Sequence, residues 1–132
     1  MIFIIGGNSQ GKLEFAKGLL GLQDGSIADG EECSFHHAFD KPVLNKLHML
    51  IKRVLAEDID PMEFVMAGIE RNPSITVICD ELGSGVVPVN QADREIQEQV
   101  GRIQCSIAKK AEKVYRVYCS LPVLIKGIEN GA

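Results

Sequence analysis

The opening residues, MIFIIGGNSQGK, limit most strongly what this chain can fold into. The apolar run from Ile2 to Ile5 is typical of a buried strand, and it leads straight into two glycines. Glycines at positions 6, 7 and 11 permit backbone angles at which consecutive N–H groups point toward one anion. Lys12 then opens a helical pattern, and the N-terminus of a helix attracts negative charge. This order of strand, glycine loop and helix predicts a phosphate-binding site in an α/β sheet.

The loop fits the pattern G-x-x-x-x-G-K-[ST] up to Lys12, but Leu13 stands where the pattern requires a hydroxyl. In such loops the backbone holds phosphates, the lysine reaches the β- and γ-phosphates, and the hydroxyl binds Mg²⁺. We therefore expect a nucleotide here, with Lys12 as a catalytic residue that stabilises phosphate charge. The expected nucleotide-binding residues are Gly6, Gly7, Asn8, Ser9, Gln10, Gly11 and Lys12. A tight strand-to-helix turn that carries a lysine by coincidence is the alternative.

A second apolar run ends in two acids. The segment SITVIC at 74–79 is dense enough in β-branched residues for a strand covered on both faces, and Asp80 and Glu81 follow it. Ligands of parallel sheets bind at the carboxyl ends of the strands, so these acids and the glycine loop should meet. Asp80 is the expected Mg²⁺ ligand, acting through water, and Glu81 the expected base or nucleotide ligand. Two solvated acids beside the loop are the alternative.

Periodicity predicts the remaining elements of a single domain over residues 1–132. Helices are expected over 11–20, from an N-cap at Asp40 through 43–55, from Pro61 to about 71, and from an Asn90 cap to 111. Strands are expected at 2–5, 26–28, 74–79 and 113–119, with 120–127 as an extension or an edge strand. Residues 29–40 should form a loop. Strands that alternate with helices predict a three-layer α/β domain with a mostly parallel sheet.

Composition argues against several classes of protein. The formal charge is -4 and the basic residues are scattered, which is unlike a nucleic-acid binder. No run approaches the roughly 18 apolar residues of a membrane span, and MIFII lacks the basic flank of a signal peptide. The four cysteines form no C-x-x-C pair, and Cys79 and Cys119 lie in apolar runs as small hydrophobes. We expect a cytoplasmic, reduced protein without nucleic-acid or membrane partners.

A long C-terminal segment, DELGSGVVPVNQADREIQEQVGRIQCSIAKKAEKVYRVYCSLPVLIK, resembles the bifunctional adenosylcobinamide kinase/adenosylcobinamide-phosphate guanylyltransferase family. The first loop is similar to the G-G-x-x-S-G-K-S loop of that family, so the likeness covers about 1–20 and 75–126. Beyond that loop, the matching positions are Glu81, Gly83, Gly85, Pro88, Arg94 and Gly101. The resemblance implies a P-loop NTPase-like fold, GTP or ATP with Mg²⁺, nucleotide contacts from Gly83, Gly85 and Arg94, and a homo-oligomer, often a trimer.

The resemblance also implies phosphorylation of adenosylcobinamide, followed by transfer of GMP through a guanylylated histidine. His36 and His37 lie roughly where that histidine should be, but the Arg and T-x-E segment that follow it in the family do not follow here. Solvated loop histidines are the alternative, and we do not expect guanylyl transfer through them. His48 falls within the expected 43–55 helix, where it should be structural or exposed.

Two functions therefore stay open. The first is a small kinase or nucleotidyltransferase of corrinoid metabolism, with Lys12 and Glu81 as its catalytic residues. The second is a non-catalytic nucleotide-binding or regulatory relative. The motifs kept at both ends favour the enzyme. The departures from the family pattern favour the relative: Leu13, Gln97-Glu98 in place of Arg-Asp, and Gln104-Cys105 in place of Asn-Gln.

Overall fold

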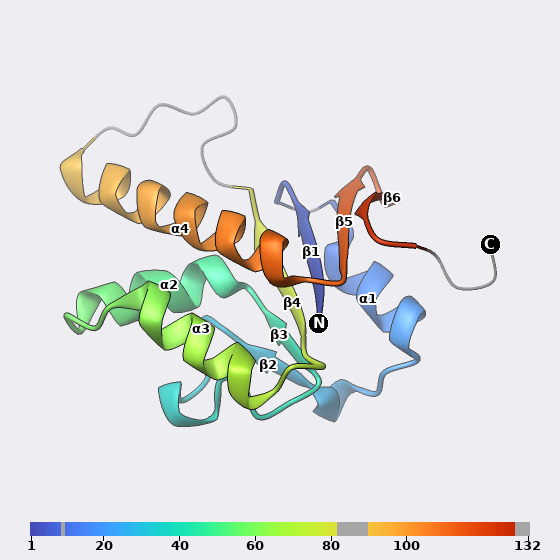
Figure 1. Ribbon diagram of the computed structural model, residues 1–132, viewed down its shortest axis with the longest axis horizontal. Helices are drawn as coiled ribbons and strands as arrows, with labels where there is room; N and C mark the ends of the chain where they lie inside the picture. Colours follow the sequence, from blue (N-terminus) through green and yellow to red (C-terminus); the bar gives the residue numbers. More distant parts are fainter. Residues whose placement is uncertain (9, 82–89, 129–132) are drawn as a thin grey trace.

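The computed structural model describes residues 1–8, 10–81 and 90–128 (Figure 1). Two short 3₁₀ turns, Asp24–Ser26 and Phe35–His37, lie between its regular elements. In chain order these are β1 (Ile2–Gly6), α1 (Lys12–Leu20), β2 (Ile27–Asp29), β3 (Val43–Asn45), α2 (Leu47–Ala56), α3 (Pro61–Arg71), β4 (Thr76–Asp80), α4 (Gln91–Lys110), β5 (Lys113–Tyr118) and β6 (Leu121–Lys126).

The six described strands form one sheet in the order β2-β3-β4-β1-β5-β6. Strand β1 lies inside the sheet and pairs in parallel with both β4 and β5. Only the last described pair, β5 with β6, is antiparallel. The register places Gly6 beside Asp80, so the glycine loop after β1 and the acidic end of β4 leave the sheet side by side. The expectation that these two segments meet at one edge is confirmed.

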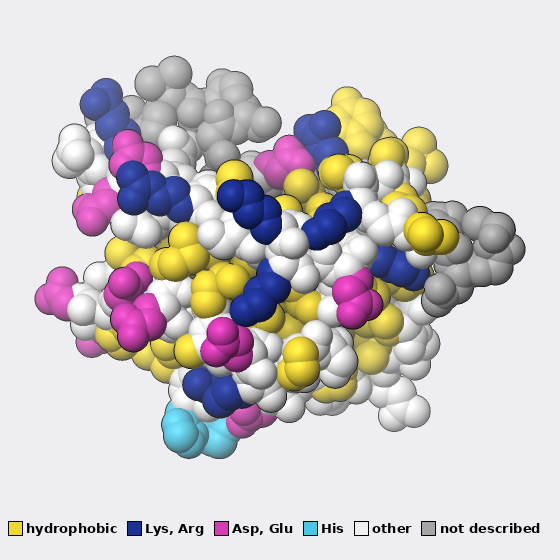
Figure 2. Space-filling model, in the orientation of Figure 1, with side chains coloured by type: hydrophobic (Ala, Val, Ile, Leu, Met, Phe, Trp, Pro, Cys, Tyr) yellow, Lys and Arg dark blue, Asp and Glu magenta, His cyan; other side chains and the backbone are white. Residues whose placement is uncertain are grey.

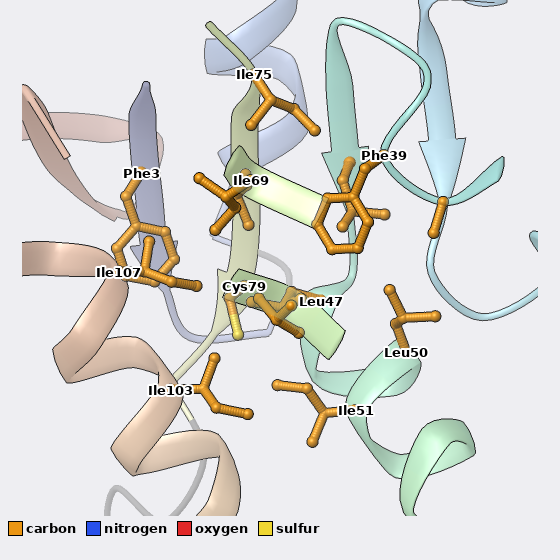
Figure 3. Packing of buried hydrophobic residues seen from close by; sticks show 14 of the residues in the cluster. Phe3, Phe39, Leu47, Leu50, Ile51, Ile69, Ile75, Cys79, Ile103 and Ile107 are labelled. Atoms are coloured by element: carbon orange, nitrogen blue, oxygen red, sulfur yellow. The ribbon is translucent and has the colours of Figure 1, made fainter. Parts of the chain in front are cut away.

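Helices cover both faces of the sheet. Helix α1 packs on one face, where Ala16 meets Ile4 and Ile78 in a small buried cluster. Helices α2, α3 and α4 cover the opposite face over a larger cluster (Figures 1 and 3). There, Ile107 of α4 lies beside Phe3 of β1, and Ile103 lies nearer Cys79 of β4, as Figure 3 shows. The predicted three-layer, mostly parallel α/β fold of the P-loop NTPase type is confirmed.

The helix expected from an Asp40 cap is wrong at its start. Val43, Leu44 and Asn45 form strand β3 between β2 and β4, and α2 begins only at Leu47. Val43 is buried on the α1 face and Leu44 on the opposite face, which is the alternation of a strand. Lys46, in the left-handed region at φ 58°, turns the chain from strand to helix. The carboxylate of Asp40 caps no helix and lies 2.6 Å from Nδ1 of His37.

The other expected elements agree with the structure within a few residues. Asp60 caps α3 by accepting from the amides of Met62 and Glu63, and Asn90 caps α4 through the amide of Asp93. Of the two alternatives for 120–127, the edge strand is confirmed as β6. Among the described helices, none is both long enough and apolar enough to cross a membrane.

Candidate functional site

The glycine loop is held in place by the turn between β5 and β6. Gln10 accepts the backbone N–H of Cys119 on its side-chain oxygen at 2.6 Å and that of Ser120 on its carbonyl at 2.9 Å. Gly11, at φ 89°, begins α1 in the left-handed region. A Cβ at this position would approach Oγ of Ser120 to 2.7 Å, so both conformation and space require glycine here.

Lys12 is the buried cation of this loop. Its side chain leaves the first turn of α1 and is only 7% exposed. The ammonium donates to the carbonyl of Gly7 at 2.7 Å and lies 2.7 Å from Oδ1 of Asp80. Two residues expected in the site, Lys12 and Asp80, are thus in direct contact. Because both are largely out of water, the attraction between them is screened little by solvent.

Asp80 is held at each of its polar groups. One carboxylate oxygen contacts Lys12, and the other lies 3.3 Å from Nε2 of His48. Its backbone N–H donates to Nδ1 of His48 at 3.2 Å, and its carbonyl accepts from Nε2 of Gln104 at 2.8 Å. These contacts come from α1, α2 and α4, so three helices fix the position of one carboxylate at the end of β4.

His48 lies in the candidate site, where the sequence analysis did not place it. It lies buried in the first turn of α2. Since Nδ1 accepts the amide of Asp80, the ring proton belongs on Nε2, which then donates to the carboxylate. Burial lowers the pKa of His48, and the charge of Asp80 opposes this shift only in part. The imidazole is therefore neutral near pH 7. Recognising β3 would have placed His48 at the carboxyl edge of the sheet, next to Asp80.

A cavity of about 640 Å³ opens in front of Lys12, between the glycine loop and the start of α2. Its volume falls in the usual range for small-molecule sites. The polar side chains that line it include Asn8, Gln10, Lys12, Lys46, His48 and Asp80. The carboxylate of Glu31 accepts a hydrogen bond from Lys46 at 3.0 Å, and this bond raises the pKa of Lys46. The carboxylates of Glu14, Glu31 and Asp80 also line the cavity, and Asp80 and Glu31 pair with its two lysines, so an anionic ligand here would compete with them for Lys12 and Lys46.

Other expected site residues lie elsewhere. Glu81 forms a two-point ion pair with Arg116 of β5, at 2.9 and 3.0 Å. Arg94 is exposed in the first turns of α4. Within the described part of the chain, neither Glu81 nor Arg94 lines the Lys12 cavity. Leu13 does line it, so an apolar side chain occupies the position of the hydroxyl in the motif. Ser9, Gly83 and Gly85 lie outside the described residues.

The two loop histidines are separated from Lys12. His36 lines a different cavity, of about 830 Å³, beside Phe64 and Arg71 of α3. His37 is exposed and pairs with Asp40. Neither occurs among the described residues that line the Lys12 cavity. This separation agrees with the interpretation of both as loop histidines without a part in group transfer at the phosphate site.

A metal ion could find few ligands in this part of the molecule. Among the described residues, no group of three or more His, Cys, Asp or Glu side chains is arranged to hold a metal. Asp80 is the carboxylate in contact with Lys12, and Leu13 offers no oxygen. This donor set does not fit a metal cage made by protein alone. It does fit an Mg²⁺ ion that is held mainly by phosphates and water, with the carboxylate of Asp80 contacting it through a water molecule.

Strand, glycine loop and helix, with a buried lysine beside an acid on the neighbouring parallel strand, define an α/β domain of the P-loop NTPase class. Residues 40–125 match the family model described as cobinamide kinase / cobinamide phosphate guanyltransferase. The chain belongs to this family, which confirms the resemblance noted in the sequence. The matched range starts after the glycine loop. The interpretation of this loop as a phosphate-binding loop therefore depends on its own sequence and geometry.

A curated relative supports the same family. The chain is similar to the bifunctional adenosylcobalamin biosynthesis protein CobU of Salmonella typhimurium (strain LT2), with 29% identity over 68 residues. The aligned region covers 51% of this chain and 38% of that protein. The match thus spans well under half the length of the relative.

Proposed function

We propose that residues 1–132 form one nucleotide-binding domain, which holds the phosphates of GTP or ATP in the Lys12 cavity. The main support is the position of Lys12, a buried ammonium at the wall of a cavity that is also lined by Lys46, by neutral hydrogen-bonding groups and by the carboxylates of Glu14, Glu31 and Asp80. Its partners are one carbonyl and one carboxylate, and a phosphate chain offers stronger charge than either. The remaining loop residues, 6–11, contribute backbone N–H groups to the phosphates.

Nucleotide binding then requires an exchange of partners. Lys12 leaves Asp80 for the phosphates, and Asp80 loses its cation but keeps its contacts with His48. The freed carboxylate oxygen of Asp80 would be the protein group that holds Mg²⁺, through water. When bound, Mg²⁺ neutralises phosphate charge. Leu13 leaves one protein ligand fewer than the motif provides, so the metal depends more strongly on the phosphates and water.

The reaction that the family supports is transfer to a corrinoid, either of a phosphoryl group to adenosylcobinamide or of GMP to adenosylcobinamide phosphate. Lys12 stabilises the charge of the transferred group, as phosphoryl transfer depends mainly on positioned positive charge. Glu81 is the proposed base, and its ion pair with Arg116 must open before it can accept a proton. Gly83, Gly85 and Arg94 complete the proposed nucleotide contacts. We also expect a cytoplasmic homo-oligomer.

A non-catalytic nucleotide-binding or regulatory protein is the second candidate. Three observations favour it: Leu13 replaces the hydroxyl, Glu81 faces Arg116, and His36 lies in a separate cavity. Each weakens a catalytic step and leaves phosphate binding by the loop and Lys12 intact. The two candidates differ in turnover and share nucleotide binding.

Calorimetric titration with GTP and ATP, each with and without Mg²⁺, tests the nucleotide site. The wild type should bind, and Lys12→Ala should lose at least about tenfold in affinity, roughly 1.4 kcal/mol. Lys52→Ala, which removes an exposed lysine from α2, is the matched control and should bind like the wild type. No binding to the wild type at millimolar nucleotide would contradict the proposal. Turnover with adenosylcobinamide would then separate the enzyme from the non-catalytic relative.

A further inference from the structure

The start of α2 places a second lysine at the cavity in front of Lys12. Lys46 lies between strand β3 and helix α2, and therefore at the carboxyl edge of the sheet, where parallel sheets bind their ligands. Its side chain lines the cavity from the side of α2. The side chain of Lys46 is 42% exposed, whereas that of Lys12 is 8% exposed. Of the two lysines among the described lining residues, Lys46 is thus the more accessible to an entering ligand.

The backbone at Lys46 departs from what local stability favours. Its φ of 58° and ψ of 51° lie in the left-handed region, which glycine adopts without strain and lysine does not. Lys46 is also the N-cap residue of α2, where Ser, Thr, Asp or Asn could accept an amide and lysine cannot. Backbone strain and departures from local sequence preference are concentrated at functional sites. Both departures therefore indicate that the ammonium at this position serves binding rather than folding.

A short acidic turn after β2 holds Lys46 beside the cavity. Glu31 of this turn accepts a hydrogen bond from the ammonium at 3.0 Å. The turn packs closely on the backbone before α2, because the N–H of Gly30 donates to the carbonyl of Asn45 at 2.8 Å and a Cβ at Gly30 would collide with the carbonyl of Lys46. Arg53 of α2 donates to two carbonyls of the same turn, at 2.8 and 2.7 Å. The position of Glu31 is therefore fixed by its backbone.

The ion pair between Lys46 and Glu31 is easy to open. Its two side chains are 42% and 49% exposed, and ion pairs in contact with water contribute little to stability. The hydrogen bond from Glu31 raises the pKa of Lys46, so the ammonium stays charged near pH 7. A phosphate carries more charge than a carboxylate and forms strong charge-assisted hydrogen bonds. It can therefore replace Glu31 as the partner of Lys46.

The charges around the cavity show what a phosphate chain can gain there. On the helical face that Figure 2 draws, basic and acidic side chains are interspersed, so neither sign dominates it. Within the cavity, the carboxylates of Glu14, Glu31 and Asp80 offset the two lysines. An anion therefore gains little from the general field of the protein. It gains from the ammonium groups that it can take over from their carboxylate partners.

We propose that Lys46 binds the terminal phosphate of the nucleotide and selects triphosphates over monophosphates, with Glu31 as the partner that it leaves. This inference rests on the nucleotide site proposed above. The glycine loop and Lys12 hold the phosphate chain from one side. Lys46 completes the contacts of the γ-phosphate from the side of α2. A monophosphate is too short to contact both lysines and gains nothing from Lys46. Glu31 opposes binding, because the entering phosphate has to displace it.

Calorimetry with GTP and GMP, and with ATP and AMP, each with Mg²⁺, tests this role. Lys46→Gln keeps the length of the side chain and removes its charge. It should weaken triphosphate binding about tenfold or more and change monophosphate binding by less than about threefold. Lys46→Arg keeps the charge and should retain the preference of the wild type. Lys52→Gln, which changes an exposed lysine of α2, is the matched control and should leave both affinities unchanged.

Glu31→Gln tests the exchange of partners. It frees Lys46 and should raise triphosphate affinity by about threefold or more. Glu32→Gln, which removes an exposed carboxylate from the same turn, should raise it less, because its charge acts only at long range. Combined with Lys46→Gln, the gain from Glu31→Gln should shrink to that of Glu32→Gln.

Circular dichroism and thermal unfolding verify that each variant is folded. A Lys46→Gln protein that keeps the preference for triphosphate, or that loses both ligands equally, overturns the inference. Equal effects of Glu31→Gln and Glu32→Gln overturn the exchange of partners. A wild type that binds no nucleotide overturns this inference together with the nucleotide site. Binding that depends on Lys12 and not on Lys46 overturns this inference alone.

Discussion

His48 contacts Asp80 at two points, the amide and the carboxylate, and so joins the start of α2 to the end of β4. In the proposed exchange of Lys12 from Asp80 to a phosphate, this contact would keep the carboxylate oriented without adding a second positive charge beside it. A lysine or arginine at position 48 would compete with the proposed Mg²⁺. A neutral imidazole can hold the acid and still leave it negative.

Replacing His48 should separate two components of nucleotide binding. His48→Ala removes the acceptor for the Asp80 amide and the donor for its carboxylate, so stability should fall by about 1–3 kcal/mol. Binding of nucleotide alone should persist, while the gain in affinity from Mg²⁺ should shrink. His48→Gln, which restores an N–H donor, should recover part of that gain. Urea denaturation and calorimetry measure the two effects.

His36→Ala is the control for this experiment, because His36 lines the other cavity. It should leave both stability and the Mg²⁺ effect unchanged. A His48→Ala protein that keeps the full Mg²⁺ effect would show that Asp80 needs no support from the imidazole.

The contact between Lys12 and Asp80 could be anticipated from the sequence, and the role of His48 could not. Lys12 begins α1 and Asp80 ends β4, and both of these elements have a strong local sequence pattern. Because parallel strands place their carboxyl ends at the same edge of the sheet, the two residues are brought together. The assignment of His48 depended on where α2 begins. Val43 and Leu44 also fit the helical spacing that continues through Leu47 and Ile51, so a three-residue strand was hidden inside a helical pattern.

At the scale of secondary-structure elements, the packing of α3 depends on its close approach to the 35–40 loop, which precedes β3 in the chain. A Cβ at Gly68 would collide with the ring of Phe39, which is itself buried in the larger core cluster. Glycine is therefore needed at this position because there is no room for a side chain, and not because the backbone adopts an unusual conformation. The helix and the 35–40 loop can pack this closely only while position 68 has no side chain.

Gly68→Ala should destabilise the protein by about 1–3 kcal/mol, because a packed ring or the helix backbone must shift. Gly101→Ala is the matched control in α4, where an added Cβ meets nothing within 4 Å. That change should instead stabilise the protein, by about 0.5–1 kcal/mol, through helix propensity. Urea denaturation of both variants measures the difference. Equal effects of the two substitutions would contradict the close approach seen at Gly68.

Element boundaries with local causes were predicted better than those set by pairing. The start of α3 at Pro61 and the Asn90 cap of α4 depend on residues within three positions, so the sequence predicted both. Strand β3 exists because its neighbours β2 and β4 complete its hydrogen bonds, and these lie at least 14 residues away along the chain. Cys119, expected as a small hydrophobe inside a strand, is exposed because the chain turns there, at φ 50°.

At the scale of the whole molecule, the reactivity of the Cys79 thiol indicates whether the sheet is intact. This thiol is buried near the carboxyl end of β4, a strand inside the sheet, and burial raises its pKa to about 12. Since the thiolate is the reactive species, a disulfide reagent at pH 8 should modify the exposed Cys105 and Cys119 quickly and leave Cys79 intact. Cys79 should react only as denaturant opens the whole fold. Peptide mapping by mass spectrometry follows each thiol.

Cys79→Ala should abolish this slow reaction and leave the fast ones unchanged. If native Cys79 reacted as quickly as Cys105, the sheet centre would have to open locally, and the packing of α4 over β4 would be wrong.

The position of β1 in the sheet has a consequence for synthesis on the ribosome. This strand is made first, but its neighbours β4 and β5 begin at Thr76 and Lys113. The loop that follows β1 also needs the amides of Cys119 and Ser120. A nascent chain that stops short of these residues has made Lys12 but cannot yet complete its surroundings. The proposed nucleotide binding therefore has to wait until synthesis has passed Ser120.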